Sequence, residues 1–154
     1  MTMVSKQFLI QNQSELSNIS QFLYQSLNLP TLILLQGNLG AGKTTLAKYF
    51  LEQFGLLQNQ IKSPTYSLIN NFSVYINNQK ISINHLDLYR LNESDPLLLE
   101  EIIQLISEPF SLTLIEWPEK LDLQSLIYPS LQVIEINLKL QKNQSREVVI
   151  EIKP

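Results

Sequence analysis

The sequence has 154 residues and a formal net charge of −3, and its length fits one domain over residues 1–154. It contains no cysteine, which excludes disulfides, thiolate metal sites and cysteine nucleophiles. It also lacks a basic tract, an apolar signal core and an apolar run of membrane-spanning length, so we expect a cytoplasmic protein with no membrane segment and no tight binding to nucleic acid by this chain alone.

The first predicted elements lead to a glycine-rich loop. Residues 6–10 favour a strand, and the apolar spacing after Ser14 predicts an amphipathic helix that ends before Pro30. Residues 31–36 form a short apolar run that suits a strand buried on both faces. Helical spacing of apolar residues then predicts a helix over 43–54. The loop between this strand and this helix holds three of the chain's four glycines.

This loop fits the phosphate-binding P-loop pattern G-x-x-x-x-G-K-[ST]. Gly37, Gly40 and Gly42 can adopt positive φ at little steric cost, so that successive backbone N–H groups point at an anion. Lys43 would reach the β- and γ-phosphate oxygens, and Thr44 would offer its hydroxyl to Mg²⁺. Because strand, loop and helix occur in the required order, the motif predicts a nucleotide site rather than an ordinary glycine-rich turn.

The rest of the chain predicts one more helix and several strands. Asp95 and Pro96 indicate a helix start, with Asp95 as the N-cap, and the helix continues to about Ile106. The last two strands flank a turn at 142–145 and predict an antiparallel hairpin. The strands predicted here are 66–76, 81–88, 112–115, 131–140 and 146–153. The fold class that fits is α/β: a P-loop NTPase-like mixed sheet with a parallel core, flanking helices and an antiparallel C-terminal hairpin.

Two acidic residues are candidates for the second half of a nucleotide site. A P-loop site needs a carboxylate at the end of a neighbouring strand to hold Mg²⁺. Asp87 follows residues 81–86 of one predicted strand, and Glu116 follows the short apolar run 112–115. Both would emerge at the carboxyl ends of strands, where ligands bind to open α/β sheets. The alternative for Asp87 is a turn or capping carboxylate, and Glu116 has a similar structural alternative at the strand end.

A loop before the second strand pair is a further candidate. Pro64 stiffens it, and Ser63 and Thr65 offer hydroxyls. Such a loop could sense the γ-phosphate and Mg²⁺, as switch segments do. A plain connecting turn fits the spacing equally well.

The single histidine, the single tryptophan and the two arginines have open roles. His85 lies on a predicted strand and fits a core or rim histidine better than a catalyst. Trp117 suits stacking on a base or partner and suits packing equally. Arg90 follows the strand of Asp87 and could approach the site, whereas Arg146 belongs to the C-terminal hairpin. With so few arginines, the chain is expected to lack a full clamp for phosphoryl transfer.

Four motifs together resemble the TsaE (YjeE) ATPases. They are the P-loop run at 37–45, Ser-Pro-Thr-Tyr at 63–66, His-Leu-Asp-Leu-Tyr-Arg-Leu at 85–91 and Ile-Glu-Trp-Pro-Glu at 115–119. The resemblance covers nearly the whole chain. It implies a small P-loop ATPase that uses ATP and Mg²⁺ and supports threonylcarbamoyladenosine (t6A) formation at adenosine 37 of tRNA. It also implies binding to a TsaB–TsaD complex, with tRNA met only indirectly through that complex.

The resemblance also implies roles for individual residues. Lys43, Asp87 and Glu116 would be catalytic, and Mg²⁺ would be held by Thr44 together with these two carboxylates. Which of the two carboxylates lies closer to the metal stays open. Asn38 stands where the family usually has Asp, and residues 99–103 lack a glycine often present there. The implied nucleotide-binding residues are Gly37, Asn38, Leu39, Gly40, Ala41, Gly42, Lys43, Thr44, Thr45 and Thr65.

Two alternatives use the same P-loop. One is a small-molecule kinase, which would need an acceptor pocket and a lid that the sequence does not reveal. The other is a nucleotide-gated binding module without catalysis, which shares every binding residue with the ATPase. A GTPase is disfavoured because the sequence has no Asn/Thr-Lys-x-Asp segment to read guanine.

Overall fold

The structure is a computed structural model that describes residues 3–62, 68–92 and 95–153. The strands are β1 (Val4–Ile10), β2 (Thr31–Gln36), β3 (Ile69–Ile76), β4 (Gln79–Asp87), β5 (Ser111–Glu116), β6 (Gln132–Leu140) and β7 (Arg146–Lys153). The helices are α1 (Leu16–Gln25), α2 (Lys43–Glu52) and α3 (Pro96–Ser107), with the short 3₁₀ turns η1 (Gln13–Glu15), η2 (Pro118–Lys120) and η3 (Leu123–Leu126).

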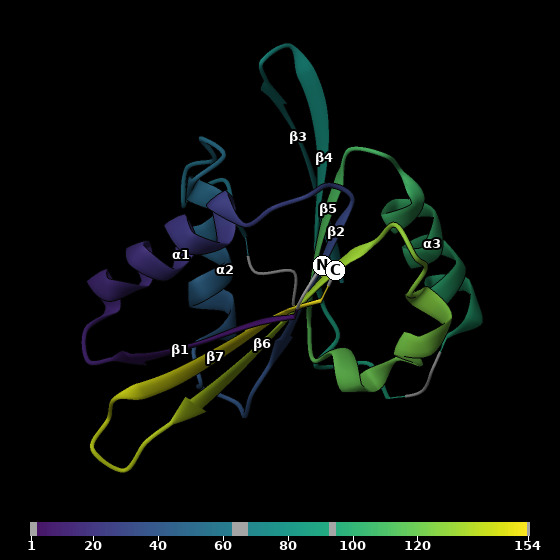
Figure 1. Cartoon of the computed structure of the whole chain (residues 1–154). Helices are drawn as coiled ribbons and strands as arrows, with labels where there is room; N and C mark the ends of the chain where they lie inside the picture. Colours follow the sequence, from purple (N-terminus) through teal and green to yellow (C-terminus); the bar gives the residue numbers. More distant parts are fainter. Residues whose placement is uncertain (1–2, 63–67, 93–94, 154) are drawn as a thin grey trace.

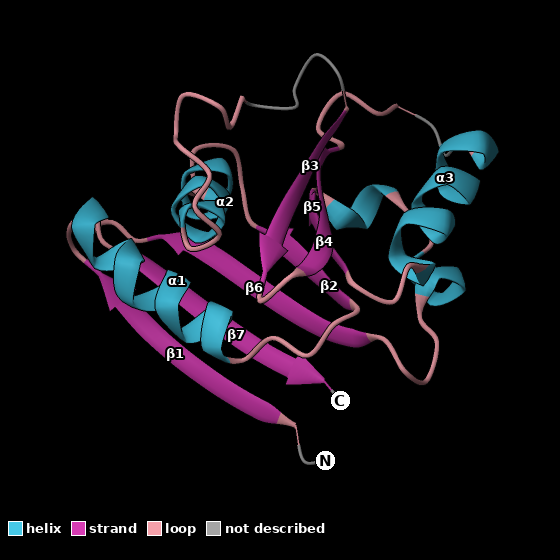
Figure 2. Cartoon of the chain, turned by 90° about the horizontal axis from the view of Figure 1, so that it is seen from above, coloured by secondary structure: helices cyan, strands magenta, loops and turns pink. Residues whose placement is uncertain are grey.

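The strands that the structure describes form one sheet in the order β1-β7-β6-β2-β5-β4-β3. The inner pairs β6–β2, β2–β5 and β5–β4 are parallel. The outer pairs β1–β7, β7–β6 and β4–β3 are antiparallel. Helices α1 and α2 cover one face of the sheet and α3 covers the other (Figures 1 and 2). The predicted fold class, a parallel core with an antiparallel C-terminal hairpin, is therefore confirmed.

Burial explains why the inner strands form where they do. Every residue of β5 and all but the last of β2 are buried, as expected for strands covered by helices on both faces. By contrast, β3 alternates between exposed and half-buried residues at the sheet edge. One apolar core lies between the sheet and the α1–α2 layer, and a second lies under α3. The nucleotide motif thus follows the most enclosed part of the sheet.

Several predicted boundaries hold and a few shift. The predicted strand 31–36 is β2, and Asp95 caps α3 by accepting a hydrogen bond from the Leu97 N–H at 2.9 Å. The predicted strand 66–76 begins at Ile69, while its first residues lie partly outside the described ranges. The turn between β3 and β4 is Asn77-Asn78, both with positive φ, as in tight hairpins. The turns η1, η2 and η3 were not predicted, because such short 3₁₀ segments carry no periodic signal.

Within the described residues, no helix combines the length and the apolar composition that crossing a membrane requires.

Candidate functional site

The P-loop runs from the end of β2 to the start of α2, and three glycines set its path. Gly37, Gly40 and Gly42 have φ of +146°, +79° and +107°, values that L-residues rarely adopt. Gly37 also passes so close to β6 that an added Cβ would lie 2.4 Å from the Leu138 carbonyl oxygen. The loop is further closed by a hydrogen bond from the Ala41 N–H to the Asn38 oxygen at 3.1 Å. Glycine is therefore required here both for conformation and for close packing.

Lys43 lies inside the loop. Its side chain is buried, and its ammonium donates to the Gly37 oxygen at 2.5 Å and to the Asn38 oxygen at 3.1 Å. The same nitrogen lies 3.9 Å from the centroid of the Trp117 ring, a cation–π contact. The ammonium is thus satisfied by weak acceptors that phosphate oxygens, being charged, would outcompete.

Burial and nearby carboxylates act on Lys43 in opposite directions. Burial lowers the pKa of Lys43 below its ordinary value of 10.5, and the negative charges of Glu116, Glu119 and Asp87 partly offset this shift. The net direction is downward, so burial is the larger effect. A bound polyanion would add negative charge and favour the charged lysine.

Asp87 and Glu116 meet at the ends of two neighbouring parallel strands. They are paired residues in the β4–β5 register, and both are almost fully buried, at 6% and 2% exposure. The Thr44 hydroxyl donates to Glu116 Oε2 at 2.7 Å. This contact connects the P-loop helix directly to the end of β5. The structure therefore brings together Lys43, Thr44 and the two carboxylates that the sequence named.

Asp87 also has a local structural contact. Its Oδ1 accepts a hydrogen bond from the Tyr89 N–H at 3.0 Å, which closes the turn after β4. This contact matches the alternative considered for Asp87 from sequence. The two roles are compatible because a carboxylate has several acceptor positions.

His85 contacts Glu116 from within the sheet. The histidine is fully buried, and its Nε2 lies 2.8 Å from Glu116 Oε1. Its Nδ1 makes no hydrogen bond to any residue that the structure describes. The sequence interpretation of a core histidine thus holds for burial, but it missed the contact with Glu116. Side-chain alternation gives part of the signal, because His85 and Asp87 are two apart on one strand and so share a face; the register of β4 with β5 supplies the rest.

Trp117 adopts an unusual backbone conformation directly after β5. Its φ of +61° is left-handed, which is rare for a bulky residue, and its N–H donates to the Leu35 oxygen at 3.2 Å. The indole lies between Lys43 and Tyr89, with the two aromatic centroids 5.0 Å apart. Of the two roles weighed from sequence, packing inside the site is the one that these contacts describe.

A pocket of about 370 Å³ is lined by Lys43, Thr44, the two strand-end carboxylates and Trp117. Arg146, the first residue of β7, joins them, and its Nε donates to the Ala41 oxygen at 3.1 Å. The sequence placed this arginine on the hairpin without linking it to the P-loop. Arg90 is not among the residues that line this pocket, and Thr65 lies outside the described residues. The lining residues are Leu39, Gly40, Gly42, Lys43, Thr44, Thr45, Asp87, Tyr89, Glu116, Trp117 and Arg146.

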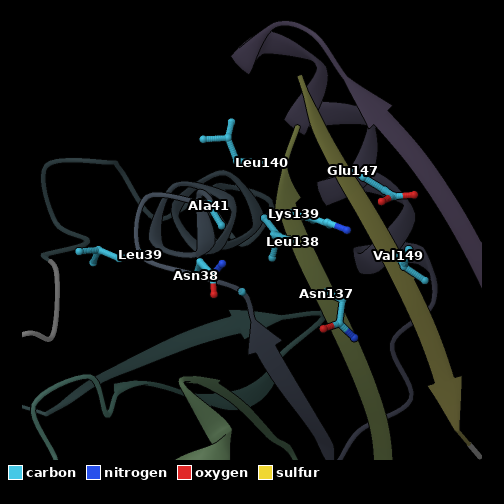
Figure 3. Close-up of a pocket in the computed structure, with 10 residues that line it drawn as sticks. Asn38, Leu39, Ala41, Asn137, Leu138, Lys139, Leu140, Glu147 and Val149 are labelled. Atoms are coloured by element: carbon cyan, nitrogen blue, oxygen red, sulfur yellow. The ribbon is translucent and has the colours of Figure 1, made fainter. Parts of the chain in front are cut away.

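A second, larger pocket of about 570 Å³ borders the other side of the loop. Figure 3 shows Asn38 and Leu39 of the P-loop across from Asn137 and Lys139 of β6 and Glu147 of β7. This pocket contains neither Lys43, Thr44 nor the two strand-end carboxylates. The smaller pocket, not the larger one, therefore holds the groups suited to phosphate chemistry.

The oxygen donors in the smaller pocket fit Mg²⁺. One hydroxyl and two carboxylates match a metal that keeps several waters and shares its remaining positions with substrate phosphates. No group of three or more His, Cys, Asp or Glu side chains able to hold a metal occurs among the described residues. A cage made entirely of protein ligands is thus not present in that part of the chain, and a site completed by nucleotide phosphates agrees with the donors found.

Comparison with known proteins identifies relatives of this chain. The family model "Threonylcarbamoyl adenosine biosynthesis protein TsaE" matches residues 10–148. A protein of that name from Synechocystis sp. is 39% identical over 119 residues, which span 76% of this chain and 73% of the relative. Another from Rickettsia bellii is 32% identical over 149 residues, covering 95% and 94%. The crystal structure of Bacillus subtilis YdiB has the same fold, with a TM-score of 0.67 at 20% identity, covering 98% of this chain and 87% of that one.

Proposed function

The chain belongs to the TsaE family, and from this membership we propose that it is an ATPase subunit that supports t6A formation at adenosine 37 of tRNA. It acts with a TsaB–TsaD-like complex and meets tRNA only through that complex. Residues 1–154 form one ATPase domain. We also expect a cytoplasmic location, because tRNA is modified there.

The observation that carries the ATPase proposal is the 2.7 Å contact between the Thr44 hydroxyl and Glu116. It joins the P-loop helix to a buried carboxylate at the end of the adjacent parallel strand. Asp87 and Lys43 line the same pocket. A phosphate-binding loop, a cation, a hydroxyl and two carboxylates are the parts that nucleotide hydrolysis at a P-loop requires.

In this proposal the chain's own groups bind and orient MgATP. The P-loop N–H groups and Lys43 hold the β- and γ-phosphates, while Thr44, Glu116 and Asp87 provide the oxygen ligands for Mg²⁺. When bound, Mg²⁺ neutralises negative charge that develops on the phosphate oxygens. One of the two acidic side chains would orient the water that attacks the γ-phosphate in line with the leaving oxygen.

Hydrolysis by the isolated chain is expected to be slow. The described pocket contains two cationic side chains, Lys43 and Arg146, and the second is engaged with a loop carbonyl. An arginine supplied by a partner raises hydrolysis at related sites by about 10³–10⁵-fold. The exposed Leu39 and Tyr89 at the pocket wall offer a surface for such a partner.

Three measurements test the proposal. Calorimetry of the purified chain should show ATP binding that strengthens with Mg²⁺. Phosphate release and t6A formation should then reach multiple turnovers when the chain is added to TsaB–TsaD with ATP, but not with a non-hydrolysable analogue. Absence of metal-dependent ATP binding would contradict the proposal.

The Glu116→Gln variant separates catalysis from simple gating. If the variant and the wild type release phosphate at the same near-zero rate with partners present, the chain is a nucleotide-gated module. Phosphate transfer from ATP to a metabolite, faster than to water, would instead indicate a kinase.

A further inference from the structure

His85 occupies a position where an apolar side chain would be expected. On β4 it shares a face with Ile81 and Ile83, and its β5 partner in the register is Leu114. These neighbours belong to the apolar core under α1 and α2. Burying an imidazole in such surroundings costs free energy unless its nitrogens find partners. Packing alone therefore does not account for a histidine at this position.

The polar contact of His85 is with one atom of the candidate site. Its Nε2 lies 2.8 Å from Glu116 Oε1, while Nδ1 has no hydrogen-bond partner among the described residues. A neutral imidazole carries one N–H. With the hydrogen on Nε2, the ring donates a hydrogen bond to Glu116, and the atom without a partner is the Nδ1 lone pair. With the hydrogen on Nδ1, a buried N–H would lack an acceptor instead. The ring thus donates to the carboxylate.

Glu116 is then held at both of its oxygens. Oε1 accepts from His85 and Oε2 accepts from the Thr44 hydroxyl at 2.7 Å. If Thr44 and Oε2 held a metal ion, the contact of Oε1 with His85 would still be available to orient the carboxylate. Mutation of a residue that orients a metal ligand in this way lowers metal affinity or activity by about 10–100-fold.

Resting on the proposed function, we propose that His85 is a positioning residue that fixes the Glu116 carboxylate, so that Oε2 stays directed at Thr44 and the Mg²⁺ position. It touches neither the nucleotide nor the metal. Its loss should therefore weaken the binding of the metal in the nucleotide complex and leave nucleotide binding without metal unchanged.

The test compares variants that keep or remove the donor. His85→Leu removes the hydrogen-bond donor to Glu116 while keeping a similar side-chain volume. His85→Asn keeps a donor but on a side chain too short to reach as far as Nε2. His85→Gln keeps an amide N–H at about the reach of Nε2. Asn84→Leu is the matched control, because Asn84 is also buried on β4 but bonds Thr113 on the opposite face, away from the site.

The measurement is Mn²⁺ binding, by electron paramagnetic resonance, to each protein saturated with a non-hydrolysable ATP analogue. Calorimetry in excess chelator gives the nucleotide affinity without metal. We expect His85→Leu and His85→Asn to lower Mn²⁺ affinity by about 10–100-fold, with His85→Gln and Asn84→Leu close to wild type.

Three outcomes would overturn the inference. The first is an Mn²⁺ affinity of the Leu and Asn variants equal to that of the wild type. The second is an equal loss in the Asn84→Leu control, which would indicate a general effect of disturbing β4. If the Leu variant does not fold, equal affinities of the Gln and Asn variants would likewise contradict it. A wild-type chain that binds no Mn²⁺ with nucleotide contradicts the proposed function itself, and this result is distinct from the other three.

Discussion

Replacing Gly37 with alanine should destabilise the fold far more than the same change at Gly40. Both glycines have positive φ, +146° and +79°, so each alanine is strained by about 1–2 kcal/mol. At Gly40 the new methyl meets nothing within 4 Å, but at Gly37 it lies 2.4 Å from the Leu138 oxygen. That oxygen is backbone of a central strand and cannot swing aside. Overpacking of this kind adds about 1–3 kcal/mol.

The expected loss of unfolding free energy is therefore about 2–5 kcal/mol for Gly37→Ala and about 1–2 kcal/mol for Gly40→Ala. Urea denaturation followed by circular dichroism measures both. In thermal melts each kcal/mol corresponds to about 2–4 °C for a chain of this size. Equal losses in the two variants would refute the reasoning, because they would show that the approach of the loop to β6 does not constrain residue 37.

Three further predictions concern side chains of the site and of the second core. Lys43→Ala should abolish nucleotide binding in calorimetry, because the phosphates lose the cation enclosed by the loop; unaltered affinity would show that the motif is misassigned. Arg146→Gln should weaken nucleotide binding by about 10–100-fold, the value of one charge-assisted hydrogen bond, because the guanidinium lines the pocket and has donors besides the one given to Ala41; an affinity equal to that of the wild type would show that Arg146 only stabilises the loop through Ala41. Tyr128→Phe should lower the free energy of unfolding by about 1 kcal/mol, because the hydroxyl donates to the Ile106 oxygen at 2.6 Å. Burial raises the pKa of Tyr128 above its ordinary value of 10.0. The difference in unfolding free energy between wild type and Tyr128→Phe should therefore be complete below pH 10.0 and disappear as the pH rises through the raised pKa. A difference that denaturation curves show to be constant into strong alkali would count against this explanation.

The sequence predicted the parts of the fold and site that depend on local signals. The apolar run of β2 and the glycine spacing place a phosphate loop between a strand and a helix. Asp87 and Glu116 could be named because each ends a buried strand, and such ends meet at one edge of a parallel sheet. Their mutual register, in contrast, depends on the pairing of β4 with β5.

Residues that reach the site through long-range pairing were missed. Arg146 lies at the P-loop because β6 pairs with β2 and β7 pairs with β6, and no local pattern specifies where a C-terminal hairpin docks. The left-handed conformation of Trp117 has no local signal either, since the residues that usually adopt it are glycine and asparagine. The contact of His85 with Glu116 needed strand alternation and strand register together, and the sequence supplied only the first.

The position of β2 has a consequence for how the protein is made. Both of its neighbours, β5 and β6, come from the second half of the chain, from residue 111 onward. A nascent polypeptide that has emerged only as far as α3 carries the whole phosphate loop, but the two strands that flank β2 in the sheet have not yet been made. Ordering of the loop must wait for contacts of large sequence separation, which form slowly. Ribosome-bound chains should therefore acquire the capacity to hold a triphosphate only near the end of translation.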